Sequence, residues 1–165
     1  GETGLDERIE KRIPQELQKR LFSAQLGLAK KYSLPVIVHC VGRYGAVYDM
    51  LREWAAETVP TLGDRLEGKK GGRFLMHAAN CSPEMVRDFE KIGGRFSFGL
   101  RELSTERGVK CAKAVSPDRI LIESDSAASR KISDETLLRL SEILEVSDMD
   151  LSETLYSNFN DFYSK

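Results

Sequence analysis

Five short apolar segments recur along the chain, one about every 30 residues, and this period constrains the fold more than any other feature of the sequence. Segments with helical periodicity separate them. The apolar residues run continuously instead of alternating with polar ones, which indicates strands buried on both faces. Strands of this kind that alternate with helices predict a parallel α/β sheet. The predicted strands are residues 1–5, which give the weakest signal, 35–40, 73–78, 95–100 and 119–124.

The intervening segments predict helices with recognisable boundaries. In the first of them, Leu17, Leu21, Ala24 and Leu28 lie on one stripe, the pattern of an amphipathic helix. Ser82 precedes Pro83 and is expected to cap the helix that follows. Residues 60–72 are rich in glycine and charge and predict a loop. The expected helices are residues 14–32, 44–58, 83–92 and 105–114, one that Ser133 caps, and a last one at 151–163.

Three of the strands end in side chains that can bind a metal ion. PVIVHC carries His39, RFLMHA carries His77, and RILIESD ends at Asp125. Glu2 falls near the end of the weak first strand. In parallel α/β sheets, ligands sit at the carboxyl ends of the strands. Two imidazoles and two carboxylates suit Zn²⁺, Mn²⁺ or a similar divalent ion. On the residues alone, a structural role for both histidines is an equal alternative.

Composition narrows the function classes. The 165 residues are enough for one domain, which we place at 1–165. A net charge of −1 excludes a global positive field that would draw the protein to nucleic acid or to a membrane. The apolar runs are too short to span a bilayer. Three widely spaced cysteines fit a reducing compartment, so we expect a cytoplasmic protein, with the nucleus as an alternative. Cys40 is expected to be a small core residue because it points away from the face of His39.

Several motifs, in collinear order, resemble the TatD-related deoxyribonucleases. They are GETGLD, QKRLFSAQLGLA, PVIVHC, FLMHAANCSPEM, FSFG, PDRILIESDS and SNFNDFY. The resemblance implies a TIM-barrel fold of the amidohydrolase superfamily and a hydrolase that cleaves phosphodiester bonds in DNA. It also implies up to two divalent ions, Mg²⁺, Mn²⁺ or Zn²⁺, as cofactors.

The resemblance also implies roles for individual residues. Glu2 would bridge the two ions, and His39 and His77 would ligate the second. Asp125 would ligate the first and take a proton from the attacking water, so Glu2 and Asp125 are the expected catalytic residues. Arg43 would reach a backbone phosphate, with a solvated loop charge as an equally good reading.

Two further side chains are left with open alternatives. Arg101 has the same two readings as Arg43. Glu123 is either an outer support for the metal site or an acid of the barrel interior, since it shares a strand face with Asp125.

The chain departs from the family pattern at its beginning. The H-x-H pair of the family's first strand is missing, and GETGLD corresponds to the fourth strand of eight. A complete (β/α)₈ barrel needs about 250 residues. We therefore expect an N-terminally truncated domain, the last five βα units of a longer chain. The first ion would keep only Glu2 and Asp125, whereas the second would keep Glu2, His39 and His77.

These departures leave three functions in competition. The first is a TatD-type DNase that is inactive or very weak as this short chain, with DNA as its substrate and no membrane partner. The second is an amide or ester hydrolase of the same superfamily. The third is a non-catalytic remnant or interaction module. For the full-length parent we expect a monomer.

Overall fold

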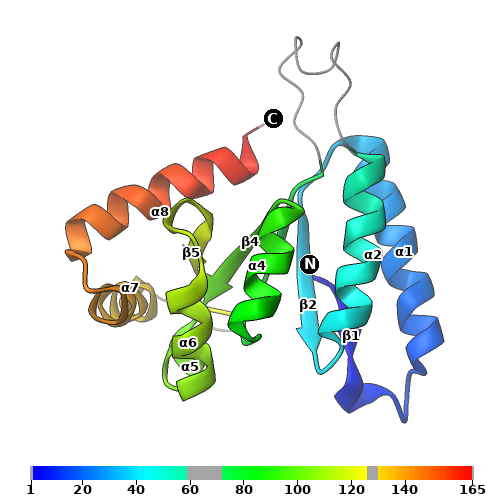
Figure 1. Ribbon diagram of the computed structural model, residues 1–165, viewed down its shortest axis with the longest axis horizontal. Coiled ribbons are helices and arrows are strands. Elements are labelled where there is room, and N and C mark those ends of the chain that lie inside the picture. Colours follow the sequence, from blue (N-terminus) through cyan, green and yellow to red (C-terminus); the bar gives the residue numbers. More distant parts are fainter. Residues whose placement is uncertain (1, 59–71, 126–129, 165) are drawn as a thin grey trace.

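The fold is built on one sheet of five parallel strands (Figure 1). The computed structural model describes residues 2–58, 72–125 and 130–164. The strand order is β1-β2-β3-β4-β5, so each strand lies beside its neighbours in the chain. The sheet thus winds in one direction, as in a TIM barrel, and does not reverse from a central strand. The strands are β1 (Thr3–Asp6), β2 (Val36–Val41), β3 (Phe74–Met76), β4 (Gly94–Phe98) and β5 (Ile120–Ile122).

Helices connect the strands, and four of them begin and end within one residue of the predicted bounds. They are η1 (Glu7–Ile9), α1 (Gln15–Tyr32), α2 (Tyr44–Glu57), α4 (Pro83–Lys91), α5 (Leu100–Leu103), α6 (Glu106–Ala114), η2 (Pro117–Arg119), α7 (Arg130–Leu144) and α8 (Asp148–Tyr163). The Ser82 hydroxyl accepts a hydrogen bond from the Met85 backbone N–H, which confirms the predicted cap. None of the helices in the described ranges is both long and apolar enough to cross a membrane.

Two helix boundaries differ from the prediction. Ser133 lies inside α7 and does not cap it, because the described helix already begins at Arg130. α8 begins at Asp148, earlier than predicted, because the Ser147 hydroxyl accepts the Asp150 N–H and caps it there. The predicted loop at 60–72 falls outside the described residues, apart from Gly72.

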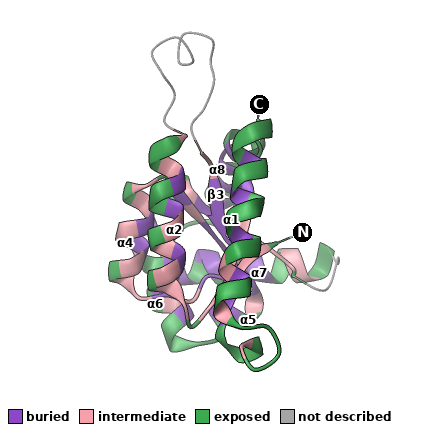
Figure 2. Cartoon of the chain, turned by 90° about the vertical axis from the view of Figure 1, so that its right-hand side faces the viewer, coloured by how far each residue is buried: buried purple, intermediate pink, exposed green. Residues whose placement is uncertain are grey.

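The sheet separates two apolar clusters. Val36, Val38 and Cys40 of β2 face the main core between the sheet and the helices, where the buried residues gather in Figure 2. The opposite face holds a small cluster in which Leu75 and Leu121 pack against Phe162 of α8. Burial on both faces, as predicted, holds for β3, but β2 alternates between buried and half-buried residues. The reason is that one face of β2 lines the site described below.

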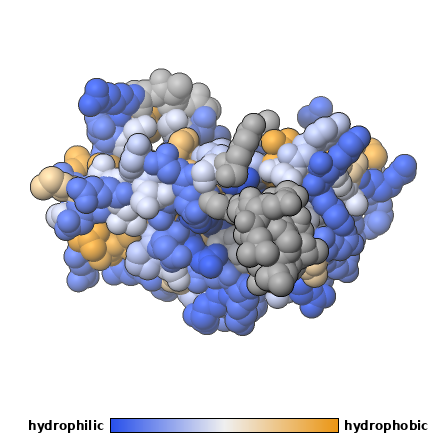
Figure 3. All heavy atoms as spheres, turned by 90° about the horizontal axis from the view of Figure 1, so that it is seen from above, coloured by the Kyte–Doolittle hydropathy of each residue, from blue (hydrophilic) through white to orange (hydrophobic). Residues whose placement is uncertain are grey.

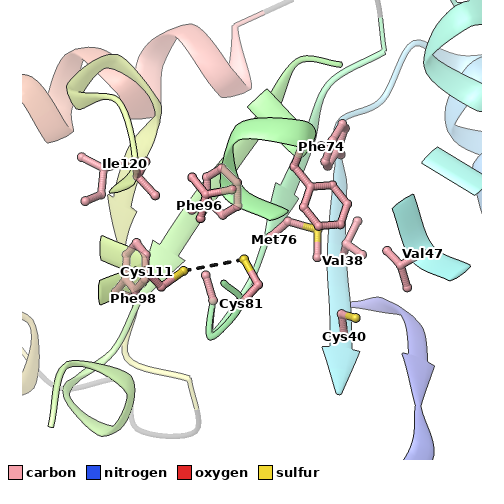
Figure 4. Packing of buried hydrophobic residues seen from close by; sticks show 14 of the residues in the cluster. Val38, Cys40, Val47, Phe74, Met76, Cys81, Phe96, Phe98, Cys111 and Ile120 are labelled. Carbon is pink, nitrogen blue, oxygen red and sulfur yellow. Dashed lines mark hydrogen bonds between the residues drawn. The ribbon is translucent and has the colours of Figure 1, made fainter. Parts of the chain in front are cut away.

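The main core is dense in aromatic side chains (Figure 4). The ring of Phe89 packs edge-on against Phe74 and Phe96. The thiols of Cys81 and Cys111 lie 3.7 Å apart within it, and both are free. Cys40 is buried, which confirms its predicted core position, and burial raises the pKa of its thiol to about 12. Cys40 is therefore a protonated core residue at neutral pH and not a nucleophile.

The helix α1 buries a different face from the one the leucines suggested. Phe22, Leu26 and Ala29 are buried, together with the side chain of Gln18. The stripe of Leu17, Leu21, Ala24 and Leu28 is exposed. Both the Phe22 stripe and the leucine stripe have helical spacing in the sequence. Only the position of the sheet decides which of them is buried.

Candidate metal centre

Glu2, His39 and His77 converge near the carboxyl ends of β2 and β3. Glu2 itself precedes β1, so the prediction that it lies near the end of that strand is wrong. One ligand atom from each of the three residues lies within 4.8 Å of the other two. His77 Nε2 lies 2.5 Å from the Glu2 carboxylate, and His39 Nδ1 lies 3.5 Å from the same oxygen. His39 Nδ1 and His77 Nε2 are 3.5 Å apart. Two imidazole nitrogens and a carboxylate oxygen thus face one small volume, as the ligands of a divalent ion do.

The register of the parallel sheet brings these residues together. Gly4 of β1 pairs with His39 of β2, so Glu2, two residues before Gly4, lies on the same face of the sheet as His39. The His77 N–H donates to the Val38 carbonyl at 3.0 Å, so the ladder between β2 and β3 continues to the second histidine. Side chains alternate along a strand, and both histidines therefore point to the face opposite Val38 and Met76. Their rings stack with centroids 5.6 Å apart.

A buried carboxylate contacts the far nitrogen of His39, that is, the ring nitrogen that is not directed at Glu2. The Asp6 Oδ2 lies 3.0 Å from His39 Nε2. Asp6 also accepts hydrogen bonds from the Arg8 backbone N–H at 2.8 Å and from Arg8 Nε at 2.9 Å. The Arg8 guanidinium holds the pKa of the Asp6 carboxyl well below its usual value, so this carboxylate is ionised and can only accept. Asp6 is not among the residues predicted for the site, although it ends strand β1 as His39 nearly ends β2.

A second carboxylate supports the far nitrogen of His77. The Glu123 Oε1 lies 3.0 Å from His77 Nδ1, and the Ala78 N–H and the Ser97 hydroxyl also donate to Glu123. The hydrogen bond to Glu123 raises the pKa of His77. Burial pushes the pKa of Glu123 upward, but the bonds from His77 and Ser97 outweigh it and the pKa lies below its usual value. Of its two predicted readings, the contacts of Glu123 match the outer support.

The other predicted residues, Asp125, Arg43 and Arg101, are not members of the cluster. Asp125 borders the same cavity as Glu2 and His77 but stands outside the cluster of three. The guanidinium of Arg43 is held by Glu10 through two hydrogen bonds of 2.5 and 2.7 Å, so the structure directs it to a carboxylate. Arg101 borders the cavity, and its Nε donates to Glu102 at 2.8 Å.

Two hollows meet at Glu2 and His77 of the cluster. The first has a volume of about 520 Å³ and reaches over the loops that follow β2, β3 and β4. The second, of about 490 Å³, extends over Leu75 and Leu121, on the same face of the sheet as the two histidines. Glu2, His77 and Asp125 border both. The first hollow, which we call the site cavity, is large enough for a small substrate with the cluster at one side.

Comparison with known proteins identifies the family. The model of the family described as "TatD related DNase" matches residues 1–164. The chain belongs to the TatD-related DNase family. The match extends over essentially the whole chain, and the prediction that these residues are the C-terminal part of a longer barrel stays a prediction.

Individual relatives agree with this family and with its fold. A protein of Bacillus subtilis (strain 168), named "Uncharacterized metal-dependent hydrolase YabD", is 33% identical over 127 residues, which cover 76% of this chain and 44% of that protein. The solved YJJV, a TatD homologue from Escherichia coli, has a TM-score of 0.79 at 18% identity and covers 100% of this chain. An uncharacterised amidohydrolase from Saccharomyces cerevisiae has a TM-score of 0.79 at 14% identity and covers 99%.

These similarities define the fold as TIM-barrel type. The chain spans less than half of the Bacillus relative, 63% of the Escherichia structure and 64% of the Saccharomyces structure. The five βα units observed here therefore correspond to a part of each of these proteins.

Proposed function

We propose that the protein is a divalent-metal-dependent hydrolase that cleaves phosphodiester bonds in DNA. The observation that carries the proposal is the convergence of ligand atoms of Glu2, His39 and His77 within 4.8 Å of one another, near the carboxyl ends of β2 and β3. Membership of the TatD-related DNase family supports it, as does the name of the Bacillus relative, which describes a metal-dependent hydrolase.

The residues present fit a divalent ion. Glu2 Oε2, His39 Nδ1 and His77 Nε2 would hold it, while Asp6 and Glu123 occupy the far nitrogens of the two histidines. Carboxylates in that position orient metal-binding imidazoles and raise their basicity. Mg²⁺, Mn²⁺ and Zn²⁺ are the candidate ions. A second ion would depend on Glu2 and Asp125. The chemistry that such ions supply is polarisation of a phosphoryl oxygen and activation of water.

The chain's own residues account for orientation and proton transfer. Asp6 and Glu123 hold the two imidazoles so that one nitrogen of each faces Glu2. The Asp125 carboxylate borders the site cavity and is exposed, so it can accept the proton of the attacking water. Arg8 and Arg101 border the same cavity and add positive charge at its edge, although each also pairs with a carboxylate.

The test compares two model substrates and one DNA substrate. We expect the chain with Mn²⁺ to hydrolyse bis(p-nitrophenyl) phosphate and single-stranded DNA slowly, and His77→Ala or Asp125→Ala to abolish both activities. Lys110→Gln, on the outer surface of α6, is the control that retains them. Hydrolysis of p-nitrophenyl acetate alone would contradict the proposal in favour of an ester hydrolase. Tight metal binding without turnover of any substrate would contradict it in favour of a non-catalytic module.

A further inference from the structure

The site cavity extends well beyond the three clustered residues. Its far lining includes Tyr44 at the start of α2, Asn80 in the loop after β3, and Arg107 in the first turn of α6. These residues come from three successive connections at the carboxyl end of the sheet, where substrates of parallel α/β folds bind. A phosphodiester held at the cluster would leave this part of the cavity for the groups attached to it.

Arg107 differs from the other arginines that border the cavity. Arg8 pairs with Asp6, and Arg101 pairs with Glu102. Within the described residues, the guanidinium of Arg107 forms no ion pair; it lies over the ring of Tyr44, with its central carbon 6.0 Å from the ring centroid. Such a contact orients a guanidinium while leaving its N–H donors available. Arg107 therefore presents an uncompensated positive charge at this end of the cavity.

Asn80 supplies a second unused group. Its Oδ1 is buried and has no hydrogen-bond partner among the residues that the structure describes. A buried amide oxygen without a donor is unfavourable, and native structures rarely leave one unexplained. Because Asn80 also borders the cavity, a bound molecule that offers an N–H or O–H donor would satisfy it.

We propose that Arg107, Tyr44 and Asn80 form a subsite for the nucleotide next to the cleaved bond. Arg107 binds the phosphate of that nucleotide, Tyr44 holds the guanidinium in place, and Asn80 accepts a hydrogen bond from the sugar or the base. This inference rests on the proposed DNA hydrolysis, since it assigns the substrate's neighbouring nucleotide to a defined part of the same cavity. It also predicts that the subsite binds a mononucleotide when no metal is present.

The acidic side chains near the subsite do not cancel its charge. Glu7 and Glu102 border the cavity as well, but Glu7 lies 3.7 Å from Arg43 and Glu102 pairs with Arg101. Glu106, which precedes Arg107, pairs with Lys110 at 2.6 Å. Glu102 and Glu106 thus have cationic partners of their own, whereas Glu7 shares Arg43 with Glu10.

The experiment measures binding of thymidine 5′-monophosphate by calorimetry in EDTA, with thymidine as the matched probe without phosphate. We expect saturable binding of the monophosphate and at least about tenfold weaker binding of thymidine. Arg107→Gln should weaken binding of the monophosphate about tenfold and leave the affinity for thymidine unchanged. Arg107→Lys should retain part of the affinity for the monophosphate. Asn80→Ala should weaken both probes. Lys113→Gln, at an exposed position near the end of α6, is the control and should match the unmodified chain.

The outcome separates this inference from the proposed function. Equal monophosphate affinity in Arg107→Gln and the unmodified chain would overturn the subsite, as would the absence of saturable binding in EDTA. Circular dichroism of each variant excludes unfolding as the cause of a loss. A failure of the proposed function would appear differently, as nucleotide binding that depends on Arg107 without any cleavage by the metal-loaded chain.

Discussion

At the scale of single residues, the centre depends on two carboxylates that lie behind the histidines. Asp6 and Glu123 both have lowered pKa values, so they are ionised and accept the N–H of His39 Nε2 and His77 Nδ1. With an ion bound, the other nitrogen of each ring would direct its lone pair toward the ion that Glu2 also holds. Asp6 and Glu123 therefore supply negative charge and orient the two imidazoles, although neither is one of the three proposed ligands.

Replacement of Glu123 tests this support. Glu123→Gln keeps the shape of the side chain and can still accept the His77 N–H, but it removes the charge. We expect the affinity for Mn²⁺ or Zn²⁺, measured by competition with a chelator, to fall about 10- to 100-fold. Glu90→Gln is the matched control, because Glu90 also accepts a backbone N–H and a hydroxyl, both from Ser116, but lies away from the centre. Unchanged metal affinity in Glu123→Gln would contradict the supporting role.

At the scale of elements, the pairing of β1 with β2 decides where Glu2 lies. Gly4 sits opposite His39 with a φ of 154°, and a Cβ at this position would lie 1.9 Å from the His39 carbonyl oxygen. The side chain of Gln18 in α1 anchors the same strand, since its Oε1 accepts the Asp6 N–H at 2.8 Å. The first strand is short, and its position rests on this close approach and this anchor.

Gly4→Ala is predicted to displace the first strand. The added methyl group cannot fit against the His39 carbonyl, so β1 must move away from β2. We expect the free energy of unfolding in urea to fall by about 2 kcal/mol or more and metal affinity to fall with it. Gly27→Ala in α1 is the control: its Cβ meets open space, and we expect a gain of about 0.5–1 kcal/mol. A Gly4→Ala chain with unaltered stability and metal affinity would refute this account of the strand.

At the scale of the whole molecule, the sheet formed by the described residues has two open edges. Within the described residues, β1 pairs only with β2 and β5 only with β4. The stripe of Leu17, Leu21 and Leu28 on α1, each about half exposed, lies on the helix that packs on β1. By contrast, the side of the molecule seen in Figure 3 is mostly hydrophilic, with small separate apolar patches. Open edges and apolar stripes favour association.

The leucine stripe of α1 therefore predicts self-association of this chain. We expect sedimentation velocity to show a concentration-dependent shift to larger species. The double substitution Leu21→Glu with Leu28→Glu should suppress the shift without lowering stability, because neither side chain contributes to the buried core. Gln25→Glu, exposed on the same helix, is the control for added charge. A monomer at all concentrations would show that the stripe does not mediate association in this chain.

The sequence by itself determined the alternation of strands and helices, the parallel sheet and the three residues of the cluster. Apolar runs and the metal-binding side chains close to them can be read from the local sequence. Glu2, His39 and His77 could therefore be predicted without knowing which residues lie near them in space. The cap at Ser82 is a similar case, because a cap depends on residues within one turn.

The tertiary structure alone decided which side chains meet across elements. It selected the Phe22 stripe of α1 over the leucine stripe, joined Asp6 to His39, and drew Arg43 to Glu10. It also left Arg107 without a carboxylate partner among the described residues. The physical reason is that a side chain's partner depends on the register and packing of distant segments. A single sequence shows a residue's chemistry but not the neighbour that will satisfy it.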